Sequence, residues 1–333
     1  MKIFDYSKAA DLDSALQQAP NGDDKAAAEF RFIAGGTTLV DLMKLNVEVP
    51  SKLMDITGLA FSKVETTSNG GLKIGALVRN SDLANHPFVR SHYEVLSEAI
   101  LAGASAQLRN RATTGGNLLQ RTRCAYFRDE AFACNKRVPG SGCPAIDGHH
   151  RNLAILGTSK SCIANNPSDM NVAMMALDAR IEVRSNKGSR TIPITEFYRL
   201  PGDTPHLETV LAPGELITHV HVDPLPAGAK TMYLKLRDRA SYEFALASAA
   251  VITQMSGDKI SYLRVAMGGV GAIPWRAVSV EKMLQGRRAD KKAFEAAADE
   301  LLKEATPLKD NAFKVELAKR CLVHSLSVST SVR

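Results

Sequence analysis

Short apolar runs alternate with stretches of helical periodicity along most of the chain. Residues 30–34 (FRFIA) have the pattern of a strand that runs into two glycines, and the next stretch places Leu39, Leu42 and Met43 at helical spacing. This alternation predicts α/β or α+β layers. Further strands are expected at 52–57, 71–78, 179–185, 232–237, 246–255 and 263–268. Further helices are expected at 80–85 (capped by Asn80 or Ser81), 93–107, 169–179, 277–284, 291–305 and 311–326.

The composition is that of an ordinary globular protein of two or three domains. Of 333 residues, 45% are apolar and 23% are charged. The proline- and glycine-rich segment at 223–229 (DPLPAGA) is the best candidate for a domain boundary. The N-terminus has no signal-peptide core, and no apolar run approaches the roughly 20 residues of a membrane helix. We therefore expect no membrane span.

The charge distribution argues against nucleic-acid binding. The 42 basic and 35 acidic residues give a net charge of +7, which is modest. The basic residues are spread along the chain and aromatic residues make up only 6%, whereas a nucleic-acid interface gathers both on one face. Anionic cofactors and acidic partner surfaces remain possible.

Two glycine-centred turns have the composition of phosphate-binding sites. In FIAGGTTLVDLMK a strand leads through Gly35 and Gly36 to a helix, where amide groups are free to bind an anion. A second turn, TTGGN, spans residues 113–117. Neither follows the G-x-G-x-x-G spacing, and the first alone is more often an ordinary turn. Together the two turns favour one ligand with two phosphates, and a dinucleotide held by its pyrophosphate fits them best.

Four of the five cysteines fall within a basic, turn-rich stretch expected to be mostly loop with short helical turns. They are Cys124, Cys134, Cys143 and Cys162. Packing is the commonest fate of such residues, zinc would usually show closer pairs, and a catalytic thiol would need a base such as His149 or His150. A cubane cluster held by a folded loop is a further possibility, in keeping with the local excess of arginine and lysine. Spacing alone leaves these alternatives open.

Three other features have plainer explanations. Cys321, in a helical stretch, is expected to be a small buried apolar residue. His219 and His221 alternate on a strand, where a half-exposed face is a better explanation than a metal site. The charged run KLRDRASYEF at 235–244 is expected to be a solvated turn.

Taken together, these segments resemble the FAD-binding subunit of the molybdenum hydroxylases, the xanthine dehydrogenase family, over essentially the whole chain. AGGTTLVDLMKL and LRNRATTGGNLL are similar to that family's two pyrophosphate loops, and NPSDMNVAMMALDA to its flavin-contacting Ser-Asp turn. PGELITHVHVDP and YLKLRDRASYEFALAS are similar to later signatures. The resemblance implies an α+β fold: a two-part PCMH-type FAD-binding domain (1–57 and 58–224) and a smaller α/β domain of the CO dehydrogenase flavoprotein type (229–333).

The resemblance also implies which residues bind FAD. The diphosphate would be lined by Ala34, Gly35, Gly36, Thr37, Thr38, Thr113, Gly116 and Asn117. Ala104 would lie beside the cofactor, and Asp169, Ile217 and Lys235 fall at positions where the family contacts FAD.

The cysteine stretch departs from most of the family, as an insertion at about 118–163. Such an insertion, carrying a [4Fe–4S] cluster, is known in 4-hydroxybenzoyl-CoA reductase and in the bacterial periplasmic aldehyde oxidoreductase, which this chain resembles more. The resemblance implies that Cys124, Cys134, Cys143 and Cys162 ligate one [4Fe–4S] cluster.

The function implied is electron transfer within a larger aldehyde oxidoreductase. A large molybdenum-cofactor subunit and a small subunit with two [2Fe–2S] clusters would be the partners, in a heterotrimer or a dimer of heterotrimers. FAD would pass electrons to an external acceptor, oxygen or a protein rather than NAD, and this chain would hold no catalytic residue. Location in the periplasm would require co-export with a signal-bearing partner, the alternative being the cytoplasm. Alternative functions are a flavin subunit of a 4-hydroxybenzoyl-CoA reductase-like or xanthine dehydrogenase-like enzyme, or a non-redox module stiffened by metal.

Overall fold

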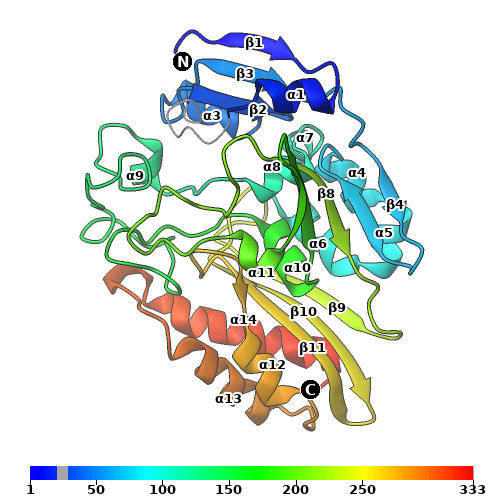
Figure 1. Ribbon diagram of the computed structural model, residues 1–333. Helices are drawn as coiled ribbons and strands as arrows, with labels where there is room; N and C mark the ends of the chain where they lie inside the picture. Colours follow the sequence, from blue (N-terminus) through cyan, green and yellow to red (C-terminus); the bar gives the residue numbers. More distant parts are fainter. Residues whose placement is uncertain (21–28, 333) are drawn as a thin grey trace.

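The computed structural model describes residues 1–20 and 29–332, which form three β-sheets with helices packed between and around them (Figure 1). The three-stranded sheet lies at the N-terminal end, the five-stranded sheet is central, and the four-stranded sheet with the last helices lies at the opposite end. Mixed helix and sheet confirms the α+β prediction. No helix in the described residues combines the length and apolarity needed to cross a bilayer.

The first sheet is parallel, with strand order β1-β3-β2. Its strands are β1 (Asp5–Lys8), β2 (Phe30–Ile33) and β3 (Lys52–Asp55), with helices α1 (Leu12–Gln18) and α3 (Leu39–Lys44). Asp11 caps α1, since its carboxylate accepts a hydrogen bond from the Ser14 amide at 2.8 Å. Apolar residues of this unit pack against Leu77 and Leu216 of the next one. The first sheet is therefore fixed to the second by a shared core.

The second sheet is antiparallel, with strand order β4-β5-β8-β6-β7. Its strands are β4 (Val64–Thr66), β5 (Leu72–Gly75), β6 (Arg180–Ser185), β7 (Gly188–Pro193) and β8 (Leu216–Val222). The associated helices are α4 (Asn80–Asn85), α5 (Pro87–His92), α6 (Glu94–Ala102), α7 (Ala106–Arg109), α8 (Thr114–Leu118), α10 (Asp169–Ala176) and α11 (Ile194–Phe197). Every residue of α10 is buried, so this helix forms the centre of the molecule.

Two helical predictions in this region are wrong in detail. The helix expected at 93–107 ends at Ala102, because Gly103 adopts an extended conformation and Ala104 a left-handed one with φ of 51°. Ser105 then caps the short helix α7. Neither Asn80 nor Ser81 caps α4, because the helix already begins at Asn80 and its N-cap position is Arg79, which makes no side-chain capping bond. At both places the helix boundary differs from the one that the sequence pattern indicated.

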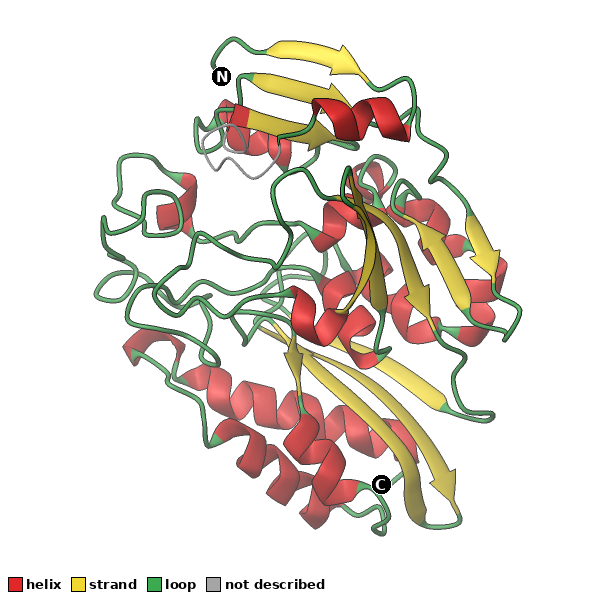
Figure 2. Ribbon diagram, in the orientation of Figure 1, coloured by secondary structure: helices red, strands yellow, loops and turns green. Residues whose placement is uncertain are grey.

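The third sheet is antiparallel, with strand order β12-β11-β10-β9. Its strands are β9 (Lys230–Leu236), β10 (Ala247–Ser256), β11 (Lys259–Gly268) and β12 (Trp275–Arg276). Helices α12 (Val278–Leu284), α13 (Lys291–Leu302) and α14 (Phe313–Thr330), with a 3-10 turn at Lys309–Asn311, follow the sheet. Helices α12 and α14 contact one face, and α6 and α10 contact the other (Figure 2).

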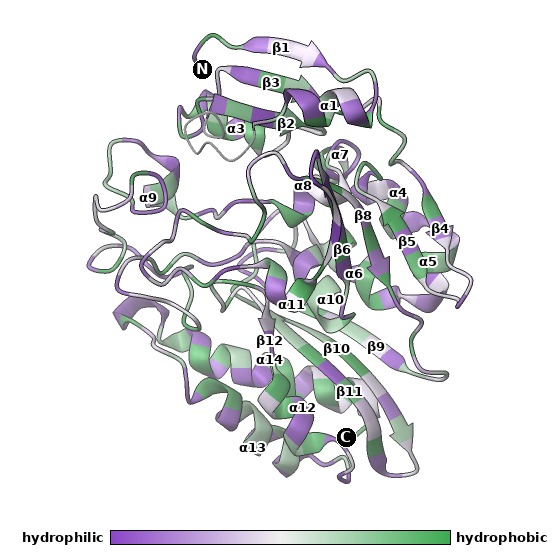
Figure 3. Ribbon diagram, viewed as in Figure 1, coloured by the Kyte–Doolittle hydropathy of each residue, from purple (hydrophilic) through white to green (hydrophobic). Residues whose placement is uncertain are grey.

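Apolar side chains follow this layering (Figure 3). The residues of β10 alternate between two cores: Ala250 and Ile252 face the helices of the second unit, while Ala249 and Val251 face the C-terminal helices. A sheet covered on both faces explains why β10 is an almost unbroken apolar run.

The insertion at residues 119–163 contains one short helix, α9 (Ala125–Arg128), and is otherwise loop, as predicted. Its small apolar core joins Phe127, Leu153 and Ile163 to Leu42 and Val47 of the first unit. In Figure 1 the insertion lies to the left of the five-stranded sheet, between the first sheet and the C-terminal helices.

Candidate functional site

The first glycine turn presents a row of unpaired backbone amides. Strand β2 ends at Ile33, and Gly36 has a φ of 73°, a left-handed conformation that glycine adopts without strain. Within the part of the chain that the structure describes, the amides of Gly35, Gly36, Thr37 and Thr38 make no hydrogen bond. Such a group of free N–H donors is suited to an anionic ligand.

The second turn is different, because most of its amides bond within the protein. The amides of Thr114 and Gly115 donate to the carbonyls of Val78 and Ala76, at 2.9 and 2.8 Å. Thr113 caps α8, and its hydroxyl oxygen accepts from the amide of Gly116 at 3.3 Å. What was expected to be a loop is mostly helix, and it can reach a ligand mainly through side chains and the exposed edge of Gly116.

The two turns touch each other at Gly35. A Cβ atom on Gly35 would lie 2.2 Å from the carbonyl oxygen of Arg111, far inside contact distance. Both turns therefore face one cavity of about 260 Å³. The predicted diphosphate residues line it: Ala34, Gly35, Gly36, Thr37, Thr38, Thr113, Gly116 and Asn117.

The four predicted cysteines surround one small void in the insertion. Cys124, Cys134, Cys143 and Cys162 all line it, together with Phe127. Cys124 and Cys162 are buried, and the other two are partly exposed. The structure thus brings together the four thiols, which are far apart in the sequence.

Polar contacts around Cys134 hold the cysteine segments together. The Asn135 amide group donates to the Ser161 carbonyl at 2.9 Å and accepts from the Gly142 amide at 2.8 Å, which joins the neighbours of Cys162 and Cys143. The Arg137 guanidinium donates to the Phe127 carbonyl at 2.7 Å, next to the helix that follows Cys124. The loop therefore has a defined conformation despite its lack of regular structure.

Burial raises the pKa of three of these thiols. The pKa of Cys124 is raised to about 11, and those of Cys143 and Cys162 are also raised, in each case chiefly by desolvation. Lys136 and the amide of Ala164, 3.5 Å from the Cys162 sulfur, act in the opposite direction on the pKa of Cys162. These donors and this cation would stabilise a thiolate.

The thiols do not converge on one point. Among the residues that the structure describes, no three His, Cys, Asp or Glu side chains are placed to hold a single metal ion. A ring of four separate thiols around a void is compatible with a polynuclear centre, in which each sulfur binds a different metal atom.

Comparisons with known proteins identify the family. The FAD-binding domain of the molybdopterin dehydrogenases matches residues 2–226, and the C-terminal domain of the CO dehydrogenase flavoprotein matches residues 232–327. The chain belongs to the flavin subunits of the molybdenum hydroxylases.

Individual relatives support the same assignment. The aldehyde oxidoreductase FAD-binding subunit PaoB of Escherichia coli is 50% identical over 98% of both chains. The glyceraldehyde dehydrogenase medium chain of Sulfolobus acidocaldarius is 29% identical over 92% of this chain and 90% of its own. A carbon monoxide dehydrogenase structure from Hydrogenophaga pseudoflava shares the fold, with a TM-score of 0.77 and 24% identity over 99% of this chain and 98% of that chain. The family and fold predictions are confirmed.

Four residues predicted from the flavin-subunit family lie outside the cavity lining. Lys235 and Asp169 form a buried ion pair, with 2.8 Å between Nζ and Oδ2, and Lys235 also donates to the Ala102 carbonyl. Ala104 lies two residues beyond that carbonyl, whereas Ile217 is buried in the core of β8. Lys235, Asp169 and the helix end before Ala104 thus form a second group next to Ser168. The Ser168 hydroxyl donates to the side-chain oxygen of Asn117 at 2.8 Å, which links this group to the cavity.

The expectation that 235–244 is a solvated turn is wrong for Lys235 and correct for its exposed tip. The side chain of Lys235 is only 4% exposed because β9 carries it under α6. Residues 238–242 are exposed.

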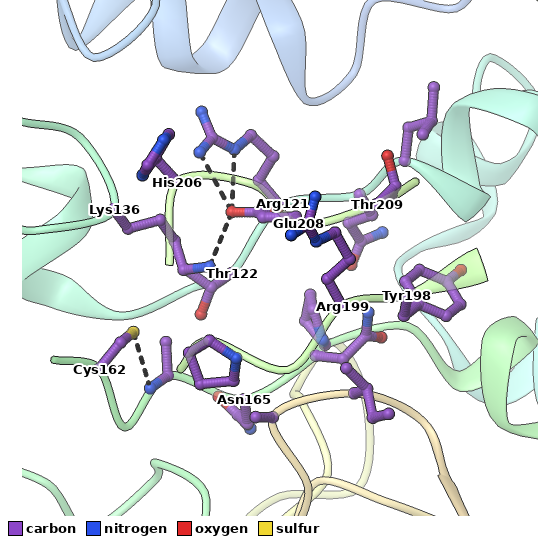
Figure 4. Close-up of a pocket in the computed structure, with 18 of the residues that line it drawn as sticks. Arg121, Thr122, Lys136, Cys162, Asn165, Tyr198, Arg199, His206, Glu208 and Thr209 are labelled. Carbon is purple, nitrogen blue, oxygen red and sulfur yellow. Dashed lines mark hydrogen bonds and ion pairs between the residues drawn. The ribbon is translucent and has the colours of Figure 1, made fainter. Parts of the chain in front are cut away.

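Several residues that line the cavity between the two glycine turns were not predicted from the sequence. Among the residues that the structure describes, the side-chain oxygen of Gln120 is buried there without a hydrogen-bond partner, and Glu48 and Arg121 form a largely shielded ion pair in its wall. These three residues, with Arg31 and Leu119, also line a neighbouring cavity of about 270 Å³ (Figure 4). Only their position after the second turn could have suggested Gln120 and Arg121.

The histidine pair on β8 is part of a strand face, as predicted. Nε2 of His221 lies 2.9 Å from one carboxylate oxygen of Glu182, and Nδ1 of His219 lies 3.5 Å from the other. Burial acts to raise the pKa of Glu182, but the two histidines and Thr218 outweigh it, so this pKa is lowered. The buried Cys321 likewise packs in the C-terminal core.

Proposed function

We propose that this chain is the FAD-bearing electron-transfer subunit of a molybdenum-dependent aldehyde oxidoreductase. The observation that carries the proposal is the 50% identity, over 98% of both chains, to an aldehyde oxidoreductase FAD-binding subunit. The substrate class comes from that relative, because the described residues of this chain include no assigned substrate site. Aldehyde oxidation would then take place on a partner subunit.

The first cavity has the donors that FAD requires. The free amides of Gly35, Gly36, Thr37 and Thr38 would bind the diphosphate, and Thr113, Gly116 and Asn117 would close the opposite wall. The unpartnered oxygen of Gln120 would accept a hydrogen bond from the cofactor. Bound FAD would supply the ability to collect electrons and pass them on, while these residues bind and orient it.

Ala104, Asp169, Ile217 and Lys235 belong to the proposal on the resemblance. Asp169 and Lys235 already satisfy each other, so their contribution would be to fix the turn at Ser168 against Asn117. Ala104 is exposed beside this group, whereas Ile217 would act only through packing.

The insertion is proposed to hold a [4Fe–4S] cluster on Cys124, Cys134, Cys143 and Cys162. Four thiols around one void, an amide donor to a sulfur and a nearby lysine are the features that support it. Because metal ligands must lose their protons, the burial that raises the thiol pKa values would be offset by the bound metal. The thiolates' negative charge would be balanced by Lys136 and the surrounding basic residues.

The partners follow from the relatives. The molybdenum-cofactor subunit and the subunit with two [2Fe–2S] clusters would supply what this family's medium subunits lack, in a heterotrimer or its dimer. The external acceptor would be oxygen or a protein rather than NAD. If the complex is periplasmic, it would be exported with a signal-bearing partner.

Purification of the complete complex tests the proposal. We expect a flavin spectrum with a broad iron–sulfur shoulder, and FAD released on denaturation. Changing Cys143 to serine should remove about four irons per complex and leave FAD bound, because the two sites have separate ligands. Flavin-free complex, or turnover with NAD as rapid as with oxygen, would contradict the corresponding part of the proposal.

A further inference from the structure

Four charged residues form a continuous ion-pair chain between the flavin cavity and the cysteine void. Glu48 pairs with Arg121. Arg121 pairs with Glu208 at 3.1 Å, and Glu208 pairs with Lys136 at 3.0 Å (Figure 4). Their side chains are 9–25% exposed, so the pairs are largely shielded from water. Pairs of this kind cannot easily exchange their partners for solvent.

One end of this ion-pair chain lies at the flavin cavity. Glu48 and Arg121 line that cavity and also its neighbour. Glu48 follows helix α3, which begins at the first glycine turn, and Arg121 follows helix α8, which begins at the second. Moving Arg121 would therefore displace the wall that both turns share with Gln120.

The other end belongs to the cysteine void. Lys136 lines the void, lies two residues after Cys134, and acts electrostatically on Cys162. Its ammonium group also donates to the Pro205 carbonyl at 2.8 Å, so its position is fixed from two sides. The guanidinium of Arg121 stacks over the ring of Phe127 at 4.5 Å, and Phe127 packs in the same core as Cys124 and Cys162.

Glu208 is the shared member of this chain. One of its carboxylate oxygens accepts from Nε and Nη2 of Arg121, at 3.2 and 3.1 Å, and lies 3.0 Å from Nζ of Lys136. Burial acts to raise the pKa of Glu208, but Arg121 and Lys136 outweigh it, so this pKa is lowered and the carboxylate stays charged. Because two cations share one oxygen, a shift of Lys136 toward an anionic centre changes how Arg121 is held.

We propose that the chain Glu48–Arg121–Glu208–Lys136 couples the two cofactor sites, so that each bound cofactor raises the affinity for the other. Glu208 is the positioning residue on which the coupling depends. The inference rests on the proposed function, since it requires FAD in the first cavity and an iron–sulfur cluster among the cysteines. A negatively charged centre at the cysteine void would attract the ammonium group of Lys136. Glu208 and Glu48 would then hold the guanidinium of Arg121 against the wall of the flavin cavity.

The test measures FAD affinity in the complete complex, reconstituted after flavin removal, with iron present and after a chelator has removed the irons that Cys143→Ser also removes, so that the partner's [2Fe–2S] clusters stay in place. In the unsubstituted complex, iron removal should weaken FAD binding about tenfold. In the Glu208→Gln complex, FAD should bind more weakly from the start, and iron removal should add no more than about a twofold change. The chelator concentration that removes half of the iron should rise with FAD in the unsubstituted complex and not in the variant.

Matched variants make the outcome decisive. Glu300→Gln removes an exposed carboxylate that pairs only with Lys303, and it should retain the tenfold effect. If Glu208→Gln prevents assembly, Lys136→Gln interrupts the same chain at its next contact and carries the same expectation. An equal effect of iron removal in Glu208→Gln and in the unsubstituted complex would overturn the coupling. Complex that binds neither FAD nor iron would instead refute the proposed function.

Discussion

The insertion and the C-terminal unit are stabilised in different ways. The C-terminal sheet and helices α12 to α14 enclose a continuous apolar core, with many side chains fully removed from water. The insertion has one four-residue helix, a small core shared with the first unit, and a set of polar bonds centred on Asn135 and Arg137. Hydrophobic burial stabilises the first region, while the second depends on specific bonds and on the centre proposed for its thiols.

We therefore expect the tolerance of each region to amino-acid substitution to depend on how that region is stabilised, and not on its distance from a cofactor. A core of many interchangeable contacts spreads the cost of a substitution. A loop held by a few specific groups has no such reserve. The variants below test that contrast.

The largest effect is expected from removing a proposed ligand. Cys162→Ser should abolish iron binding by this chain and open the insertion, because serine cannot replace a thiolate in a cluster. Iron analysis and limited trypsin digestion, which the basic insertion favours once it opens, measure the result. Cys321→Ala, in the core of α14, should leave iron content unchanged. Iron loss in that control instead would show that the ligand set is wrong.

Shortening a large side chain in the C-terminal core should have the opposite result: lower stability with unchanged iron content. Leu263 is fully buried in β11, so Leu263→Ala should lower the free energy of unfolding by about 2–5 kcal/mol through a cavity and lost burial. Iron per folded complex should not change. Thermal denaturation followed with iron analysis separates the two quantities, and a parallel fall in iron would mean that the regions are not independent.

A smaller, local effect is expected at Asn135. Asn135→Ala removes the bonds to Ser161 and Gly142, at about 1–3 kcal/mol for the groups left unpaired. Amide hydrogen exchange should accelerate in the insertion and stay unchanged in β10 and β11. The exposed Asn69→Ala serves as a control for the chemistry of the substitution. Uniform acceleration through the whole chain would contradict the local character of this bond set.

An effect that is small at pH 7 and grows with pH is expected at Lys314, where the two regions meet. This fully buried lysine donates to the carbonyls of Leu153 and Gly269 at 2.8 and 2.6 Å, and burial lowers its pKa to about 7. The unfolded chain keeps the proton up to about pH 10, so stability should rise by up to about 1.4 kcal/mol per pH unit above pH 7. Lys314→Met should flatten this slope, and the exposed Lys303→Met should not. Urea unfolding at pH 7, 8 and 9 measures it.

Sequence patterns predicted well where the cause is local. The glycine turn at Gly35 and the apolar run of β10 were visible because each depends on residue type in a short window, whereas the four cysteines were assigned as ligands by resemblance and their role as ligands stays a prediction. Helix 93–107 was predicted too long, because its break depends on the backbone conformations of Gly103 and Ala104, which the apolar pattern does not encode. The strands β1, β4 and β7 and the helix α5 were missed, being short or largely exposed.

The remaining parts of the site depend on partners far apart in the chain. The residues next to Lys235 in the sequence do not indicate that it pairs with Asp169. The ion pair of Glu48 with Arg121 joins residues of different structural units. Asn135 holds the insertion through bonds to Gly142 and Ser161 that no periodicity encodes. Such contacts follow only once the fold has brought the segments together.

The close approach of Gly35 to Arg111 makes the flavin cavity a joint product of two segments that are far apart in the sequence. The walls of the flavin cavity come from residues 31–48 and 112–121, and Arg121 is braced by Glu208. A nascent chain still lacking those later segments has the phosphate-facing amides but nothing opposite them. The cavity is thus complete only when both segments have folded against each other, so a fragment that ends before residue 112 should not retain FAD.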